Sequence, residues 1–148
     1  MRQNEFKFRV NWGDTDMAGI AYYPNFFKWF DIAGHQFFRS AGLPPAQLEE
    51  QEQVILPIIN VEGTFEKAVY YDEILTIRTR VDKLTTKTIK LVHEIYKGEE
   101  RKAYGHEIRG WVKKEGNRIK AVPIPPHVRK ILEEDVALVE DGKPRLMA

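Results

Sequence analysis

The sequence predicts an α+β fold in which a curved antiparallel sheet of about five strands wraps around one long central helix. One helical segment near the N-terminus is apolar around most of its circumference, so it must be buried on most sides. After it, apolar and polar residues alternate almost to the end of the chain, in short segments separated by tight turns. Because helix and strands are segregated, the pattern argues against a parallel βαβ arrangement.

The composition is typical of one soluble domain. The chain has 148 residues, 43% hydrophobic and 30% charged, and a chain of this length buries about 70% of its unfolded surface. The absence of cysteine excludes disulfides, thiolate metal sites and a cysteine nucleophile. A net charge of +1 argues against a nucleic-acid partner, and no apolar run suits a membrane span or a signal peptide. We expect one cytoplasmic domain over residues 1–148, with a core at about 6–125 and a C-terminal helix and tail at 126–148.

The first elements are a strand, a turn-rich loop and the central helix. Apolar residues alternate with polar ones over 6–10, which is the period of a strand. Residues 12–19 are rich in turn formers. The helix follows Pro24 and Asn25 and runs to about Ser40, since proline is favoured near a helix start and asparagine is a good cap, and Gly42 with the following proline pair ends it.

The rest of the chain is predicted as a meander of strands. A polar segment at 46–53 adds one or two helical turns before the first strand. The expected strands, which tight turns separate, span 58–65 with a bulge near Gly63, 75–82, 87–97, 102–113 and 118–121. An amphipathic helix at 127–134 and a tail of about a dozen residues complete the chain.

A loop with two carboxylates is the main chemical candidate. Asp14 and Asp16 lie between Gly13 and Gly19, shortly before the helix start. A helix N-terminus offers unpaired N–H donors and the positive end of the helix dipole. A carboxylate beside such an oxyanion site suffices for acyl transfer. From the spacing alone, the alternative that both acids only order a turn is the more common case.

Residues 11–27 resemble the signature of hotdog-fold acyl-CoA thioesterases, and most closely that of the 4-hydroxybenzoyl-CoA thioesterase group. Supporting matches at 29–31, 40–45 and 71–77 extend the resemblance, in register, over about residues 6–125. The resemblance implies the hotdog fold, which is the helix-wrapped sheet predicted above. It also implies hydrolysis of an aromatic, 4-hydroxybenzoyl-like acyl-CoA to the free acid and CoA, with no cofactor beyond the CoA of the substrate.

The resemblance assigns roles within the loop. The family's catalytic carboxylate falls on Asp16, which acts as a nucleophile or as a general base for water, and the backbone N–H of Tyr23 holds the carbonyl oxygen. Asp14 then orders the loop. Four aromatic residues either wall a substrate pocket or fill the core: Trp12, Tyr22, Tyr23 and Phe27.

Asp31 lies mid-helix among aromatic residues, where an unpaired carboxylate is expensive to bury. One interpretation pairs it with Lys28 or His35, or with a neighbouring strand. The other, implied by the resemblance, places it in the acyl pocket, where it accepts a hydrogen bond from a phenolic hydroxyl. Related enzymes for aliphatic acyl groups often carry Glu there, so Asp31 favours a hydroxylated aromatic acyl group.

The resemblance also implies CoA binding at a turn between two strands, at residues 84–88. Lys87 matches the basic residues of the family, with the hydroxyls of Thr86 and Thr88 beside it. Thr85 and Thr86 stand where close relatives have arginines, so the charge is reduced. Nearby cations offer alternatives on the same strands: Arg78, Arg80 and Lys90.

The remaining expectations concern metals, assembly and rival functions. The four histidines are scattered without metal-ligand spacing, so no metal is expected. The resemblance implies a homodimer as the minimum unit, commonly a tetramer, with active sites between subunits. Two alternatives stay open: a thioesterase for short aliphatic or arylacetyl acyl-CoA, and a non-catalytic acyl-CoA-binding protein of the same fold.

Overall fold

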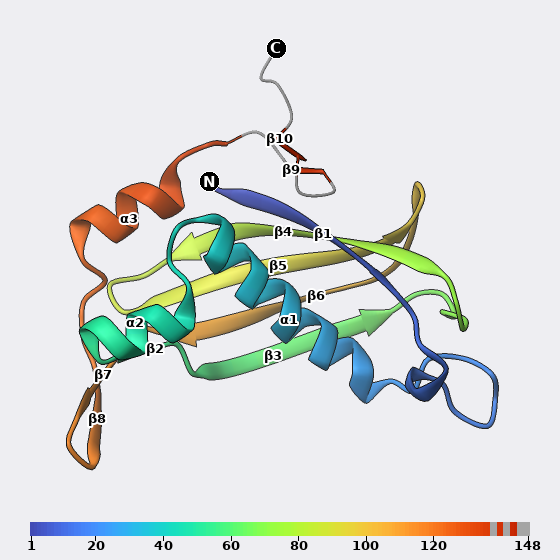
Figure 1. Cartoon of the computed structure of the whole chain (residues 1–148), viewed down its shortest axis with the longest axis horizontal. Helices are drawn as coiled ribbons and strands as arrows, with labels where there is room; N and C mark the ends of the chain where they lie inside the picture. The colour runs from blue at the N-terminus through green and yellow to red at the C-terminus, as the bar shows by residue number, and fades with distance from the viewer. Residues whose placement is uncertain (137–138, 141–142, 145–148) are drawn as a thin grey trace.

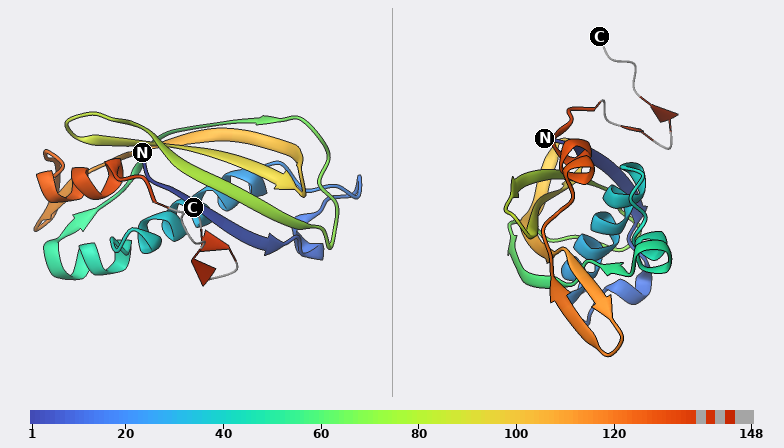
Figure 2. Two further views of the ribbon diagram at one scale, coloured as in Figure 1. Left: turned by 90° about the horizontal axis from the view of Figure 1, so that it is seen from above. Right: turned by 90° about the vertical axis from the view of Figure 1, so that its left-hand side faces the viewer.

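The computed structural model describes residues 1–136, 139–140 and 143–144. Helix α1 (Pro24–Ser40) lies in the concave side of a five-stranded antiparallel sheet of order β1-β4-β5-β6-β3 (Figure 1). The strands are β1 (Gln3–Arg9), β3 (Ile58–Phe65), β4 (Ile74–Leu84), β5 (Thr88–Lys97) and β6 (Glu100–Gly110). Figure 2 shows the sheet curving around the helix. The predicted α+β architecture is confirmed, and it is the hotdog fold.

Smaller elements surround the sheet. They are η1 (Trp12–Asp14), α2 (Pro45–Glu52), β2 (Val54–Ile55), β7 (Val112–Glu115), β8 (Arg118–Ala121), α3 (Pro126–Glu133), β9 (Val139–Glu140) and β10 (Lys143–Pro144). Strands β2, β7 and β8 form a second sheet. Both predicted short helices are present, while part of the predicted tail lies outside the described residues.

Two details of the predicted strands were wrong. The bulge expected near Gly63 lies between Ile58 and Asn60, whereas Gly63 pairs regularly with Gly105. The strand expected over 102–113 is interrupted at Trp111, which separates β6 from β7. Trp111 is 2% exposed, and its N–H donates to the carbonyl of Lys87, so packing overrides the local strand pattern there.

The core consists of two apolar clusters along α1. One contains Phe30 and Ile77, and the other contains Phe37 and Trp111. The residues that α1 buries recur three or four positions apart, as an amphipathic helix requires: Phe26, Trp29, Phe30, Ala33, Gly34, Phe37 and Phe38. Each fully buried large apolar side chain contributes about 1.5–3 kcal/mol, so α1 and the sheet hold each other in place.

A layer of buried polar residues separates the two clusters. Thr79 of β4 lies between buried Ile77 and Val81, and His93 of β5 lies opposite Thr79. Glu107 and Arg109 of β6 continue the layer and are also buried. The core is therefore apolar at both ends and polar in the middle.

Candidate functional site

The loop between β1 and α1 is ordered by Asp14. Its carboxylate Oδ2 accepts the N–H of Asn11 at 2.8 Å, and its backbone carbonyl accepts the N–H of Tyr22 at 2.8 Å. The side-chain amide of Asn25, in the first turn of α1, donates to the same carbonyl at 2.8 Å. The interpretation of Asp14 as the loop-ordering acid is confirmed.

Asp16 lies in the tight turn that follows. Its N–H donates to the carbonyl of Ile20, and its carbonyl accepts the N–H of Gly19, both at 3.0 Å. Gly19 has φ +80°, a conformation that glycine adopts at no steric cost. The N–H of Ala18 donates to Oδ1 of Asp16 at 2.8 Å. Within the described residues Oδ2 has no partner, so Asp16 presents one fixed and one available oxygen on an exposed side chain.

The N-terminus of α1 provides an unused donor. Tyr23 is the N-cap residue and Pro24 has no N–H, while the N–H groups of Asn25 and Phe26 donate to the carbonyls of Tyr22 and Tyr23. Among the residues the structure describes, no acceptor pairs with the Tyr23 N–H. The donor is therefore available to an external oxygen at the positive end of the helix dipole.

A cavity of about 250 Å³ adjoins this helix end. Its walls are mainly apolar and include Ile20, Tyr23, Phe26, Phe65 and Val69. The rings of Tyr23 and Phe65 lie 6.5 Å apart, and those of Phe26 and Phe65 lie 4.7 Å apart. Phe65, at the end of β3, was not singled out from the sequence, because a strand pattern does not show which helix its last residue meets.

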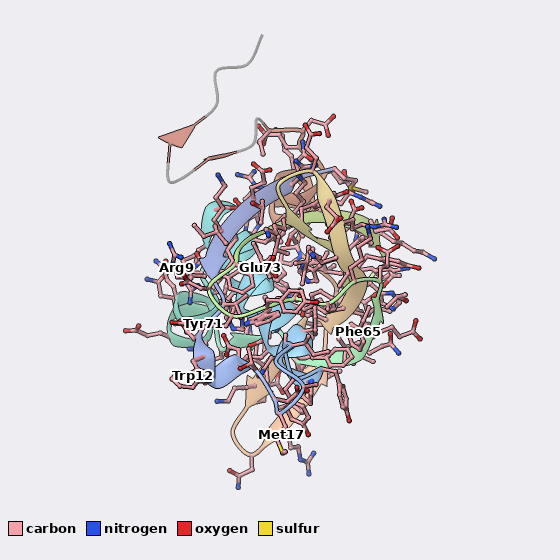
Figure 3. All side chains as sticks on the ribbon, turned by 90° about the vertical axis from the view of Figure 1, so that its right-hand side faces the viewer. Arg9, Trp12, Met17, Phe65, Tyr71 and Glu73 are labelled. Atoms are coloured by element: carbon pink, nitrogen blue, oxygen red, sulfur yellow. The ribbon has the colours of Figure 1, made fainter. Side chains whose placement is uncertain are left out.

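The aromatic residues predicted for the site divide into two groups. Tyr22 lies 5.4 Å from Tyr23, and Phe27 lies 6.0 Å from Phe65 between ring centroids. Trp12 is 78% exposed and contacts Tyr71 instead. Figure 3 shows Trp12 and Tyr71 on one side of this end of the molecule and Phe65 on the other, with Met17 at the tip of the loop.

The loop is attached to the connection between β3 and β4. The N–H of Ala21 donates to the carbonyl of Val69 at 2.7 Å, and Ile20 forms a bridge with Tyr70. Glu73 supports this connection, since its carboxylate accepts the N–H of Tyr70 at 2.6 Å and pairs with Lys97 at 2.8 Å. The position of Asp16 therefore depends on the turn that Glu73 braces.

Asp31 pairs with a neighbouring strand. Its Oδ1 accepts a hydrogen bond from Nη2 of Arg109 at 2.8 Å, and Nδ1 of His35 lies 3.5 Å from the same oxygen. The side chain of Asp31 is 46% exposed. Of the two interpretations of Asp31, the structure shows the strand pairing. Arg109 was missed from the sequence, although it alternates with Ala103, Gly105 and Glu107 on the inward face of β6.

The predicted CoA-binding turn lies at the opposite end of the sheet from Asp16, where β4 meets β5 (Figure 1). Its Thr88 hydroxyl is bonded to Thr85 within the turn, and Nη1 of Arg129 donates to the carbonyl of Thr85 at 2.7 Å. The alternative cations are engaged in ion pairs: Arg78 with Glu5, Arg80 with Asp82 and Lys90 with Asp82. One chain does not bring Lys87, Thr86 and Thr88 to Asp16.

Two findings on the described residues concern metal binding and membrane insertion. No group of three or more His, Asp or Glu side chains there is arranged to hold a metal ion. None of the helices in this part of the chain combines the length and apolar content needed to span a bilayer.

Comparison with known proteins gives consistent matches over most of the chain. The family described as the thioesterase-like superfamily matches residues 10–132. The 4-hydroxybenzoyl-CoA thioesterase of Pseudomonas sp. (strain CBS-3) is 31% identical over 124 residues, covering 79% of this chain and 88% of that protein. A gentisyl-coenzyme A thioesterase structure has TM-score 0.78 and 35% identity, covering 88% of this chain and 99% of the other. The structure of a mutant 4-hydroxybenzoyl CoA thioesterase complexed with 4-hydroxybenzoyl CoA has TM-score 0.84 and 26% identity. The match covers 90% of this chain and 100% of the other.

The bracing role of Glu73 predicts a pH dependence of stability. Burial alone would raise the pKa of the Glu73 carboxyl, but hydrogen bonds from Lys97 and the Tyr70 N–H, with the charges of Lys102 and Lys97, lower it below the ordinary 4.5. A carboxyl with a lowered folded pKa stabilises the fold fully above its unfolded pKa, and this contribution is lost as the pH falls through the folded value.

We therefore expect Glu73→Gln to be less stable than the wild type at pH 7, with a difference that shrinks below about pH 4.5. Urea unfolding at several pH values between 7 and 3 measures this difference. A difference that is constant over the whole range would show that Glu73 does not stabilise the fold through its charge.

Proposed function

The chain belongs to the thioesterase-like superfamily and is a thioester hydrolase, and we propose that its substrate is a hydroxylated aromatic acyl-CoA, which it converts to the free acid and CoA. The observation that carries this proposal is the exposed carboxylate of Asp16 in the loop that leads into α1, together with the unused Tyr23 N–H at the start of that helix. The names of the relatives support the acyl class, since 4-hydroxybenzoyl and gentisyl groups are both aromatic acyl groups that carry hydroxyls.

Asp16 is proposed as the catalytic residue. Because Oδ1 is held by the Ala18 N–H, Oδ2 is the oxygen available for chemistry. It either attacks the thioester carbonyl, forming an acyl anhydride that water then cleaves, or removes a proton from the water that attacks. In both routes the carbonyl oxygen gains negative charge, which the Tyr23 N–H and the helix dipole stabilise, and CoA leaves as a thiolate. No metal or cofactor is needed for either route.

The acyl group is proposed to lie along the exposed side of α1. Phe27 and Asp31 are four residues apart, so they face the same side of the helix. Phe27 and Tyr22 do not line the cavity described above, but they adjoin two of its walls, Phe65 and Tyr23, and are proposed to contact the acyl group. The free Oδ2 of Asp31 is proposed to accept the hydroxyl of the substrate. The role of Trp12 stays a prediction.

The CoA end of the substrate is proposed to bind at the turn between β4 and β5. Lys87 provides one cation, and Thr86 and Thr88 provide hydroxyls. Arg129 donates to the carbonyl of Thr85 and so places a second cation at this turn, with Glu133 3.9 Å from its other terminal nitrogen. Since this turn and Asp16 lie at opposite ends of one chain, a site that uses both draws them from different subunits.

A homodimer is therefore proposed as the active unit. Strand β3 is an edge of the five-stranded sheet, and its backbone is open to pairing with another strand. Apolar side chains on β3 are exposed: Ile58, Ile59, Val61 and Phe65. A second copy paired along β3 would cover the adjoining site and exclude water, which strengthens a carboxylate nucleophile or base.

Replacing Asp16 tests the catalytic assignment. We expect Asp16→Asn to reduce turnover of 4-hydroxybenzoyl-CoA by about 10²- to 10⁴-fold, the usual contribution of a positioned base, while acyl-CoA binding is retained. Release of free thiol measures turnover, and calorimetry measures binding. Asp14→Asn is the matched control, since its amide oxygen can still accept the Asn11 N–H, and its turnover should stay within about tenfold of the wild type.

Two further results refine this test. If the wild type and Asp16→Asn both bind acyl-CoA without turnover, the protein is a binding protein. Single-turnover hydrolysis in ¹⁸O-labelled water distinguishes the two catalytic routes. Label in the Asp16 carboxylate identifies a nucleophile whose anhydride water cleaves at the Asp16 carbonyl. Label in the product acid alone is expected of a general base and also of an anhydride cleaved at its acyl carbon, and trapping of the anhydride with hydroxylamine then distinguishes these two.

A panel of acyl-CoA substrates tests the acyl class. A hydrogen bond to a charged acceptor contributes about 1.5–3 kcal/mol, so we expect wild-type kcat/KM to favour 4-hydroxybenzoyl-CoA over benzoyl-CoA by about ten- to a hundredfold. Asp31→Ala should remove this preference. Higher activity on short aliphatic or arylacetyl thioesters, or an unchanged ratio in Asp31→Ala, would contradict the assignment.

Substitutions on the edge strand test the dimer. We expect Ile59→Lys combined with Val61→Lys to give a monomer with little thioesterase activity, because charges on an edge strand oppose pairing. Sedimentation velocity measures the mass. Ile119→Lys, at an isoleucine that is 64% exposed on β8, is the matched control and should stay dimeric. A wild type that sediments as a monomer at assay concentration, yet hydrolyses thioesters, would contradict the proposal.

A further inference from the structure

A continuous chain of polar side chains leads from the core of the sheet to Asp31. We call it the buried polar chain, and it consists of Thr79, His93, Glu107, Arg109 and Asp31. Thr79 Oγ1 lies 2.7 Å from His93 Nδ1, and His93 Nε2 lies 3.0 Å from Glu107 Oε1. Nη2 of Arg109 then donates to Oε2 of Glu107 at 2.9 Å and to Oδ1 of Asp31 at 2.8 Å, and so links the two carboxylates.

Stability alone does not account for this chain. Glu107 is fully buried and the Arg109 side chain is 5% exposed, and burying paired charges is often no more favourable than burying apolar residues of similar volume. The packing of α1 is also adapted to it. A Cβ at Gly34 would clash with Oε1 of Glu107, so the helix has glycine where the carboxylate approaches it.

Arg109 holds Asp31 in one orientation. Its Nη2 carries two hydrogens, one directed to each carboxylate, and its Nη1 donates to the carbonyl of Leu56 at 2.9 Å. The guanidinium is thus held at three points, and it occupies Oδ1 of Asp31. In the described part of the chain Oδ2 of Asp31 has no partner, so one acceptor remains on a half-exposed side chain.

We propose that Arg109 is a positioning residue for substrate selection. It fixes Asp31 so that the remaining oxygen accepts a hydroxyl of the acyl group, and Glu107 and His93 keep Arg109 in place. A carboxylate oxygen is a hydrogen-bond acceptor, so this site favours an acyl group that carries a hydroxyl donor over one that lacks it. This inference rests on the proposed hydrolysis of a hydroxylated aromatic acyl-CoA.

Two variants test the role of Arg109. Arg109→Gln combined with Glu107→Gln removes both buried charges together, which avoids an unpaired one. Arg109→Lys keeps a cation beside Glu107, but replaces the planar guanidinium and its several fixed donors with a single ammonium group. For each variant, kcat and KM are measured with 4-hydroxybenzoyl-CoA and benzoyl-CoA, and circular dichroism and Tm confirm folding.

We expect the double variant to lose at least tenfold in kcat/KM for 4-hydroxybenzoyl-CoA, chiefly through KM, while benzoyl-CoA changes less than threefold. Arg109→Lys should retain part of the preference. Arg101→Gln is the matched control: Arg101 also lies on β6 and pairs with two glutamates, Glu66 and Glu94, but at the surface. It should leave the ratio of the two substrates unchanged.

The outcomes separate this inference from the proposed function. A wild type without preference for the hydroxylated substrate overturns both. If the wild type has the preference and Asp31→Ala loses it, but the folded double variant keeps it, only the role of Arg109 is overturned. An equal loss for both substrates would show a merely structural role and overturns it too. Should the double variant fail to fold, an unchanged ratio in Arg109→Lys decides against the inference.

Discussion

The sharing of one guanidinium between two carboxylates ties the central helix to the sheet. Arg109 belongs to β6, Glu107 lies two residues before it, and Asp31 belongs to α1. The apolar clusters on either side bury large area, but apolar contact is not directional and would tolerate a shift of the helix along the sheet. A charge-assisted hydrogen bond of 2.8 Å does not tolerate such a shift, because it depends on the distance and direction between donor and acceptor. The polar layer therefore sets the register in which α1 lies on the strands.

Helix α1 carries the two features that the proposed reaction needs. Its N-terminus provides the unused Tyr23 N–H, and Asp31 follows eight residues later on the same rigid element. At 1.5 Å of rise per residue, about 12 Å of helix separates them. In the proposed complex, a thioester carbonyl at one point and a ring hydroxyl at the other are recognised over a distance that the helix sets.

The sequence predicted the fold because its signals are local. The apolar faces of α1, the proline at its start and the turn residues between strands each act within a few positions, and so do the turn contacts of Asp14. Glu107 and Arg109 could not be placed in this way. In one strand, alternate charged residues are typical of a solvated face, and only the pairing of β5 with β6 shows that they lie in the row that faces α1. Arg129 was missed for the same reason, since its contact with Thr85 spans 44 residues.

In the single chain the groups proposed for catalysis are exposed to water, although the proposed reaction needs water to be excluded from the carboxylate. Asp16, Tyr22 and Tyr23 are all exposed, although a carboxylate in water is a weak nucleophile. The unpaired edge of β3 ends at Phe65, one wall of the cavity beside Tyr23, so whatever pairs with this edge also covers that cavity. A second copy in the proposed dimer provides both the missing cover and the distant turn that carries Lys87. In the proposed dimer, strand pairing and exclusion of water from Asp16 are therefore consequences of the same contact.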